Sequence, residues 1–181
     1  KNKKDIRHIA RIAFKEGKQI ISNPPLRILE LDMLPFPDRN SINIKKYTYP
    51  FTICTTRGCV GECKFCSSKS FYGKNVVFRS IDNIIEELKF LKKSYFITQF
   101  YIVDDSFTIN KKRAIEFCKR LKQINYNLSW FCEARADTAD QELLRALRSA
   151  GCFKIQFGME SGNDEILQKI GKNTTTKQIE N

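Results

Sequence analysis

The sequence has a single histidine, His8, among its 181 residues. It therefore lacks a histidine pair, and it also lacks a second Cys-x2-Cys motif. Zinc-binding domains usually complete a four-ligand site with one or the other. No apolar run approaches the roughly 20 residues of a transmembrane helix, and no secretory signal peptide is visible. These absences argue against a membrane-spanning protein and against a secreted domain held together by disulfides.

Two further patterns are missing. No Gly-x-Gly-x-x-Gly follows a predicted strand, so a dinucleotide-binding Rossmann fold is unsupported. The formal charge of +12, from 32 basic and 20 acidic residues, could indicate a nucleic-acid partner, but the basic residues are not gathered in one segment. They occur in short groups, at residues 1–4, 45–46, 92–93 and 111–113. The hydrophobic content of 41% predicts instead one globular domain with a substantial core.

Cysteine is plentiful, with seven residues. Three of them, Cys59, Cys63 and Cys66, follow a β-like apolar run with the spacing Cys-x3-Cys-x2-Cys. A [4Fe–4S] cluster normally takes four cysteine ligands, so three from one loop would leave one iron open to a substrate. A zinc site or incidental buried thiols remain alternatives. Free thiols and a reduced cluster both favour a reducing, cytoplasmic setting.

From residue 47 onward, segments with strand and helix patterns alternate. β-branched and aromatic residues dominate the expected strands, and each expected helix begins at a capping side chain. This order predicts an α/β fold with a parallel sheet and right-handed crossovers. Phe153, Ile155 and Phe157 are expected on the inward face of the fourth strand. The expected strands are 49–54, 96–103, 128–132 and 153–157, and the expected helices begin at Ser80, Asn110 and Thr138.

Ionisable residues follow the expected strands. In parallel α/β barrels, functional groups gather at the carboxyl ends of the strands. We therefore expect these groups to meet the cysteines around one cavity, and we expect no such cluster at the opposite end. The groups are Asp104 and Asp105 after the second strand, Arg135 after the third, and Glu160 with Ser161 after the fourth.

The first 46 residues have a different character. Residues 12–21 predict a β-hairpin that turns at Gly17 and ends at the segment 23–25. The proline-rich stretch 31–38 predicts a non-helical connector. The chain begins without an initiator methionine, and residues 176–181 have the pattern of the capped first turn of a helix. We therefore interpret the sequence as a segment of a larger protein.

The cysteine segment, residues 55–68, resembles the cluster loop of the radical S-adenosylmethionine (SAM) enzymes, including the aromatic Phe65 before the last cysteine. Arg57-Gly58 and Ser67-Ser68 are similar to the branch that carries a cobalamin-binding domain, and the connector 31–38 is similar to the run that joins that domain to the catalytic core. The resemblance implies a partial (β/α)6 TIM-like barrel with about four of its strands present. Residues 1–46 would be the hairpin and connector from an upstream cobalamin-binding domain, and 47–181 the N-terminal part of the radical SAM core.

The resemblance also implies roles for individual residues. Cys59, Cys63 and Cys66 would hold the cluster, and Phe65 would approach the adenine of SAM. Asp104 and Asp105 would meet its amine, although Asp-Asp-Ser stands here where the family more often has Gly-Gly-Glu. Arg135 would bind the carboxylate, and Glu160 and Ser161 the ribose or methionyl part. No catalytic residue is assigned. Any cobalamin ligand would lie upstream, because Asp5-Ile6-Arg7-His8 lacks the Asp-x-His-x-x-Gly spacing.

The activity implied by the resemblance is reductive cleavage of SAM to a 5′-deoxyadenosyl radical that abstracts hydrogen. Its expected outcome is cobalamin-assisted methylation or rearrangement of a small metabolite, with flavodoxin or ferredoxin as electron donor. Two alternatives belong to other classes. One is a radical SAM methylthiotransferase acting on RNA, and the other is a non-catalytic iron–sulfur or zinc-binding module.

Overall fold

The computed structural model describes residues 6–24, 27–73 and 75–180. The basic group at residues 1–4 and Pro25 of the predicted hairpin end lie outside the described residues. The centre of the fold is a parallel sheet in which the strands pair in the order β3-β6-β7-β8. These strands are β3 (Thr52–Ile53), β6 (Gln99–Ile102), β7 (Ser129–Ala134) and β8 (Cys152–Phe157). The predicted four-stranded parallel sheet is confirmed, with a first strand much shorter than expected.

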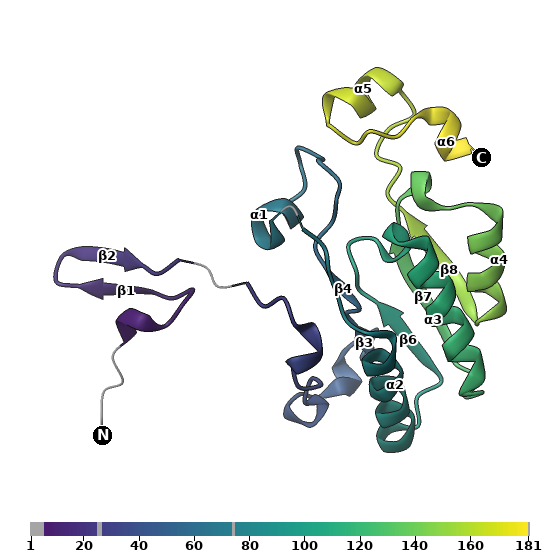
Figure 1. Ribbon diagram of the computed structural model, residues 1–181, viewed down its shortest axis with the longest axis horizontal. Coiled ribbons are helices and arrows are strands. Elements are labelled where there is room, and N and C mark those ends of the chain that lie inside the picture. Colours follow the sequence, from purple (N-terminus) through teal and green to yellow (C-terminus); the bar gives the residue numbers. More distant parts are fainter. Residues whose placement is uncertain (1–5, 25–26, 74, 181) are drawn as a thin grey trace.

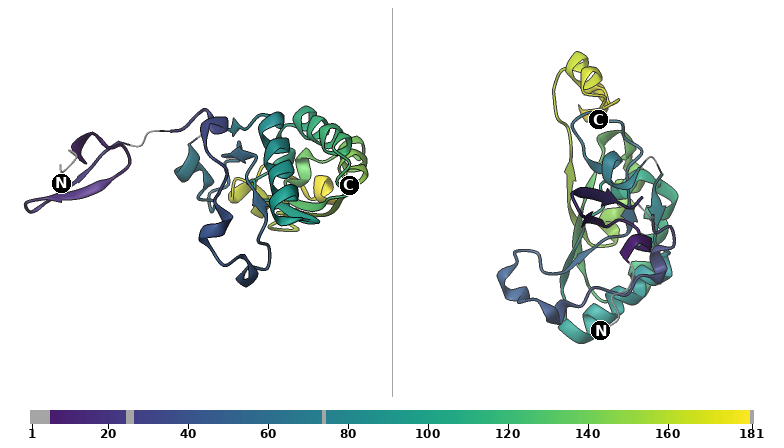
Figure 2. Two further views of the ribbon diagram at one scale, coloured as in Figure 1. Left: turned by 90° about the horizontal axis from the view of Figure 1, so that it is seen from below. Right: turned by 90° about the vertical axis from the view of Figure 1, so that its left-hand side faces the viewer.

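Three helices cover one face of this sheet (Figures 1 and 2). They are α2 (Ile81–Tyr95), α3 (Lys111–Gln123) and α4 (Gln141–Ser149), each placed between two successive sheet strands. The predicted caps Ser80 and Asn110 are confirmed, because their side chains accept hydrogen bonds from the amides of Asn83 and Arg113. The predicted cap at Thr138 is wrong. Asp140 caps α4 by accepting from the Leu143 amide, and Thr138 lies in the preceding 3-10 turn.

The core lies between the sheet and these helices. Strand pairing places Ile53, Ile102, Cys132 and Ile155 in one row across the four strands. The first three of these side chains are buried against the helix layer, and Ile155 packs at its margin. Trp130 at the centre of β7 is fully buried, and its indole N–H donates to the Ala150 carbonyl at 2.8 Å. Alternate strand residues therefore build the core, as the period-two pattern of a strand requires.

The opposite face of the sheet carries aromatic rings. Tyr101 and Phe131 stack with ring centroids 4.2 Å apart. A register shift between Trp130 and Phe131 inserts Phe153 as an extra residue in β8, and the Phe153 ring packs 5.7 Å from that of Phe131. The expectation that Phe153, Ile155 and Phe157 share a face is therefore wrong. The bulge places Phe153 on the aromatic face, whereas Ile155 and Phe157 follow the helix-facing row of Cys132 and Ala134.

The remaining elements are short. The predicted N-terminal hairpin is confirmed as a separate two-stranded antiparallel sheet, and Figure 1 shows it to one side of the parallel sheet. The connector begins with one 3-10 turn, which the non-helical prediction missed. A small antiparallel pair follows β3 and frames the cysteine loop, which we define as residues 58–67.

The strands of the N-terminal hairpin are β1 (Ala13–Glu16) and β2 (Gln19–Ser22), and those that frame the loop are β4 (Thr56–Arg57) and β5 (Val77–Phe78). The short helices are α1 (Ser68–Tyr72), α5 (Asp164–Lys169) and α6 (Thr176–Glu180). Single 3-10 turns span Ile6–His8, Leu31–Met33, Arg39–Ser41, Ile44–Lys46, Phe107–Ile109 and Ala136–Thr138.

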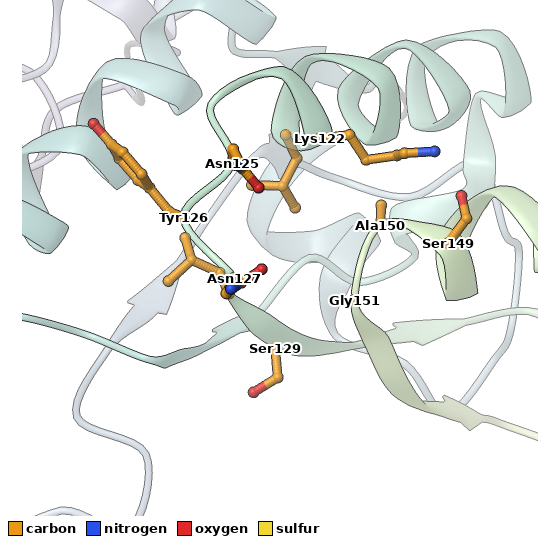
Figure 3. Close-up of a pocket in the computed structure, with 10 residues that line it drawn as sticks. Lys122, Asn125, Tyr126, Asn127, Ser129, Ser149, Ala150 and Gly151 are labelled. Atoms are coloured by element: carbon orange, nitrogen blue, oxygen red, sulfur yellow. The ribbon is translucent and has the colours of Figure 1, made fainter.

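A hollow of about 440 Å³ lies at the amino ends of β7 and β8 (Figure 3). It is bounded by the turn 125–127 before β7 and the turn 149–151 before β8. Lys122 and Tyr126 are the ionisable residues that line it, and no carboxylate or cysteine does. None of the residues expected to form the ionisable cluster lines this hollow. Across the described part of the chain, no helix is long and apolar enough to span a membrane.

A buried ion network fastens the connector to the sheet. Glu87 on α2 is 1% exposed and accepts from Arg39, the residue directly after the connector, at 3.1 Å and from Arg79 at 2.6 Å. Arg39 also donates to the Thr52 carbonyl of β3 at 2.7 Å. Removing one member of such a network leaves buried charge without a partner, which costs more than the pairing itself contributes.

We expect Glu87→Ala to lower the free energy of unfolding by about 3 kcal/mol, because it strands two buried guanidinium groups. The matched control is Glu86→Ala on the same helix. Its exposed pair with Lys89 contributes little, so the loss should stay within about 0.5 kcal/mol. Chemical denaturation followed by circular dichroism measures both values. Equal losses in the two variants would show that the buried network does not fasten the connector.

Candidate functional site

One cavity of about 310 Å³ opens at the carboxyl ends of the sheet strands. Groups from all four strand ends meet there, as the strand-end argument predicts. Seven of the residues singled out from the sequence line it, namely Cys59, Cys63, Phe65, Cys66, Asp105, Arg135 and Glu160. Glu133, Gln156 and Lys172 line it as well. Asp104 and Ser161 do not line this cavity.

Asp104 holds the base of the cysteine loop. Its carboxylate is 1% exposed and accepts hydrogen bonds from the Thr55 amide at 2.6 Å, the Thr56 amide at 3.0 Å and the Thr55 hydroxyl. Burial raises the pKa of Asp104, and the hydrogen bonds from Thr55 and Thr56 oppose that rise. Because its oxygens are already occupied by the backbone that leads into the loop, Asp104 positions the loop rather than facing the cavity.

Asp105, the next residue, points the other way. It is exposed on the cavity side, and its carboxylate accepts from the Ser68 hydroxyl at 2.7 Å. The Ser68 amide in turn donates to the Cys66 sulfur at 3.4 Å. Ser68 therefore ties the last cysteine to the end of β6 while leaving the second carboxylate oxygen of Asp105 available to a ligand.

Each of the three loop sulfur atoms has an N–H donor nearby. The Gly61 amide donates to Cys59 at 3.3 Å, and the Arg135 guanidinium lies 3.9 Å from the Cys63 sulfur. Burial raises the pKa of Cys59, and the Gly61 amide acts against that rise. Among the described residues no three His, Cys, Asp or Glu groups are already drawn together at metal-binding distance. The sulfurs share one cavity and receive N–H donors, and such hydrogen bonds tune the reduction potential of iron–sulfur clusters. The residues present therefore fit a cluster bound by Cys59, Cys63 and Cys66.

Arg135 is almost fully buried and already engaged. Its guanidinium makes a paired contact with the Asp137 carboxylate at 2.9 and 2.7 Å, and that contact raises the pKa of Arg135. It also donates to the Lys172 carbonyl at 2.7 Å and the Thr174 hydroxyl at 3.1 Å. Only the Nη1 side, which faces Cys63, opens toward the cavity.

Glu160 and Lys172 form an ion pair in the wall of the cavity. The Lys172 ammonium, 7% exposed, lies 3.2 Å from a Glu160 carboxylate oxygen. The Ser161 hydroxyl accepts from the Asn163 amide at 3.1 Å, so it stabilises the turn before α5. Sequence reasoning missed Lys172, since it follows no strand. Glu133 could have been found, because it alternates with the buried Cys132 and Ala134 along β7.

Cys118, Cys132 and Cys152 lie on helix or strand positions away from the loop. All three are buried in the core, and burial raises the pKa of Cys118 to about 12. Cys54 is half-buried between β3 and β4, where its thiol donates to the Thr56 carbonyl. None of these four cysteines lines the cavity that Cys59, Cys63 and Cys66 share. The metal-binding expectation therefore rests on Cys59, Cys63 and Cys66.

Residues 53–181 match the sequence profile described as the radical SAM superfamily. The chain belongs to this superfamily. It is 34% identical over 180 residues to a protein of Pyrococcus horikoshii named an uncharacterized methyltransferase, covering 97% of this chain and 39% of that protein. It is 31% identical over 176 residues to the cytidylyl-2-hydroxyethylphosphonate methyltransferase of Streptomyces wedmorensis, covering 87% of this chain and 32% of the relative. The chain thus spans well under half the length of these relatives.

A solved structure shares the fold. The cobalamin-dependent S-adenosylmethionine radical enzyme OxsB matches with a TM-score of 0.71 and 23% identity, over 92% of this chain and 26% of that one. Together with the parallel sheet, this likeness confirms the predicted fold class, a four-stranded portion of a TIM-like radical SAM barrel.

The two adjacent aspartates should respond differently to the same substitution. Asp104→Asn replaces an acceptor oxygen with an amide donor facing a hydrogen-bond donor of the loop, so we expect the free energy of unfolding to fall by about 2 kcal/mol. Asp105→Asn, on the exposed side, should change it by less than about 0.5 kcal/mol. Denaturant titration of the two variants gives the comparison. Greater destabilisation by Asp105→Asn would overturn the assignment of Asp104 to the loop base.

Proposed function

We propose that this chain forms part of the catalytic core of a radical SAM enzyme, with a [4Fe–4S] cluster held by Cys59, Cys63 and Cys66. The observation that carries the proposal is that these three sulfurs share one cavity with ionisable groups from the ends of the neighbouring strands. The chemistry supplied by a bound cluster and SAM is reductive cleavage of the sulfonium, which yields methionine and a 5′-deoxyadenosyl radical. The protein's contribution is to bind, orient and shield the reacting groups.

The polar groups of the cavity complement those of SAM. The free oxygen of Asp105 is suited to accept from the ammonium of the methionyl part, and Glu160 to accept from the ribose hydroxyls. The cationic Nη1 side of Arg135 is suited to the carboxylate, and Phe65, 57% exposed at the cavity edge, to contact with the adenine. We assign Asp104 and Ser161 to holding the loop and the turn before α5, because their oxygens already accept from backbone amides there.

For the protein as a whole, we propose cobalamin-assisted methylation of a small molecule. Two curated relatives are named methyltransferases, and the solved neighbour is named a cobalamin-dependent enzyme. In this proposal residues 1–46 are the hairpin and connector from a cobalamin-binding domain, and 47–181 are the N-terminal part of the radical SAM core. Flavodoxin or ferredoxin would supply the electron in a reducing cytoplasmic setting. A methylthiotransferase acting on RNA is less well supported, because the basic residues do not gather in one segment.

Anaerobic reconstitution with iron and sulfide tests the proposal. The purified protein should bind about four irons, and Cys59→Ala, Cys63→Ala or Cys66→Ala should each abolish stable binding because a [4Fe–4S] cluster held by three thiolates cannot spare one. Cys118→Ala, which removes a core thiol, is the matched control and should keep the iron. Colorimetric iron and sulfide analysis, with zinc measured alongside, gives the result.

Full iron retention in Cys63→Ala would refute the ligand assignment. Binding of one zinc in place of iron and sulfide would favour the non-catalytic zinc module instead.

A further inference from the structure

A short segment after α5 lies directly against the cysteine loop. We call residues 170–174 the strap. The Lys64 amide in the middle of the loop donates to the Ile170 carbonyl at 2.8 Å. Gly171 has a φ of +70°, and a Cβ there would lie 2.8 Å from the Glu62 carbonyl oxygen, so the two backbones touch. This close approach requires glycine at position 171.

Arg135 joins the strap to the end of β7. It is 8% exposed, and its donors reach the Lys172 carbonyl, the Thr174 hydroxyl and both oxygens of Asp137. The remaining Nη1 side lies 3.9 Å from the Cys63 sulfur. Gly61 lies against the Nη1 atom of Arg135, since a Cβ at Gly61 would come within 3.1 Å of it. One side chain thus touches the loop, the strap and the sheet.

We propose that Arg135 is a positioning residue that, through the strap, holds the tip of the cysteine loop in place. A planar guanidinium suits this task, because its fixed fork of donors can serve several acceptors in different directions at once. The base of the loop has its own anchor in Asp104, so the base and the tip of the loop are held independently. The placement stands on the contacts alone, whereas its role in presenting iron ligands rests on the proposed function.

The effect of removing Arg135 should be local. Neither the loop nor the strap contributes a residue to the main hydrophobic core. Arg135→Ala leaves a buried carbonyl, a buried hydroxyl and the Asp137 carboxylate without their donor, so the strap should open more often while the sheet and helices stay folded.

Hydrogen exchange of the iron-free protein tests the proposal. In Arg135→Ala the amides of the strap and of Lys64 should exchange about tenfold faster than in the wild type. The Lys64 amide is protected only while it reaches the Ile170 carbonyl, and the amides of residues 170–172 donate to carbonyls of α5, from which a strap without Arg135 should separate more often. Amides within β7 should not change. The matched control is Arg145→Ala, an exposed arginine on α4, which should leave the strap rates as in the wild type. Unchanged strap and Lys64 rates in Arg135→Ala would overturn the proposal.

Thr174→Val keeps the shape of the strap and removes one acceptor of Arg135. It therefore tests whether Arg135 holds the strap if Arg135→Ala does not fold. It should speed exchange in the strap by a smaller factor, and wild-type rates in a folded Thr174→Val protein would then refute the proposal. Arg135→Lys keeps the charge but loses the fork, so its strap rates should lie between those of the wild type and Arg135→Ala.

A second measurement addresses the ligand role. After reconstitution, Arg135→Ala should lose iron to a chelator faster than Arg145→Ala. Faster amide exchange without iron uptake in any variant, the wild type included, would support the strap and refute the proposed function. Normal iron retention with fast exchange would confine Arg135 to holding the strap.

Discussion

The carboxylate of Asp104 is the contact on which the geometry of the site depends. It joins the end of β6 to the backbone at Thr55 and Thr56, where the chain leaves β3 for the cysteine loop. Arg113 from α3 reinforces the same point through the Thr55 carbonyl. Buried, multiply hydrogen-bonded groups of this kind fix one backbone path and make alternatives costly. The loop therefore starts at the carboxyl edge of the sheet, where the other strand ends present their polar groups.

The adjacent residues Asp104 and Asp105 show how one strand end serves two purposes. Asp104 accepts hydrogen bonds from backbone amides, whereas Asp105 keeps one carboxylate oxygen open to the cavity. Similarly, Arg135 donates most of its hydrogen bonds to Asp137 and the strap, and its Nη1 side faces Cys63. The cavity thus combines groups that are locked in place with groups that remain available, which is the arrangement a site needs to orient a ligand.

Much of this could be predicted from the sequence, because the informative signals are local. The cysteine spacing, the caps Ser80 and Asn110, and the polar residues after each strand all depend on neighbours within a few positions. The sequence did not reveal which of the two aspartates faces the cavity, because that choice depends on contacts with Thr55 nearly fifty positions away. The bulge that turns Phe153 to the aromatic face, and the burial of Lys172 within the strap, are likewise set by packing between distant segments.

In the proposed function, three cysteines from one loop hold a cluster whose fourth iron is open to SAM. Electron paramagnetic resonance of the reconstituted, dithionite-reduced protein tests it directly. We expect the signal of a reduced [4Fe–4S] cluster whose g values shift when SAM is added, because SAM would become a ligand of the open iron. A cluster signal that is identical with and without SAM would contradict it.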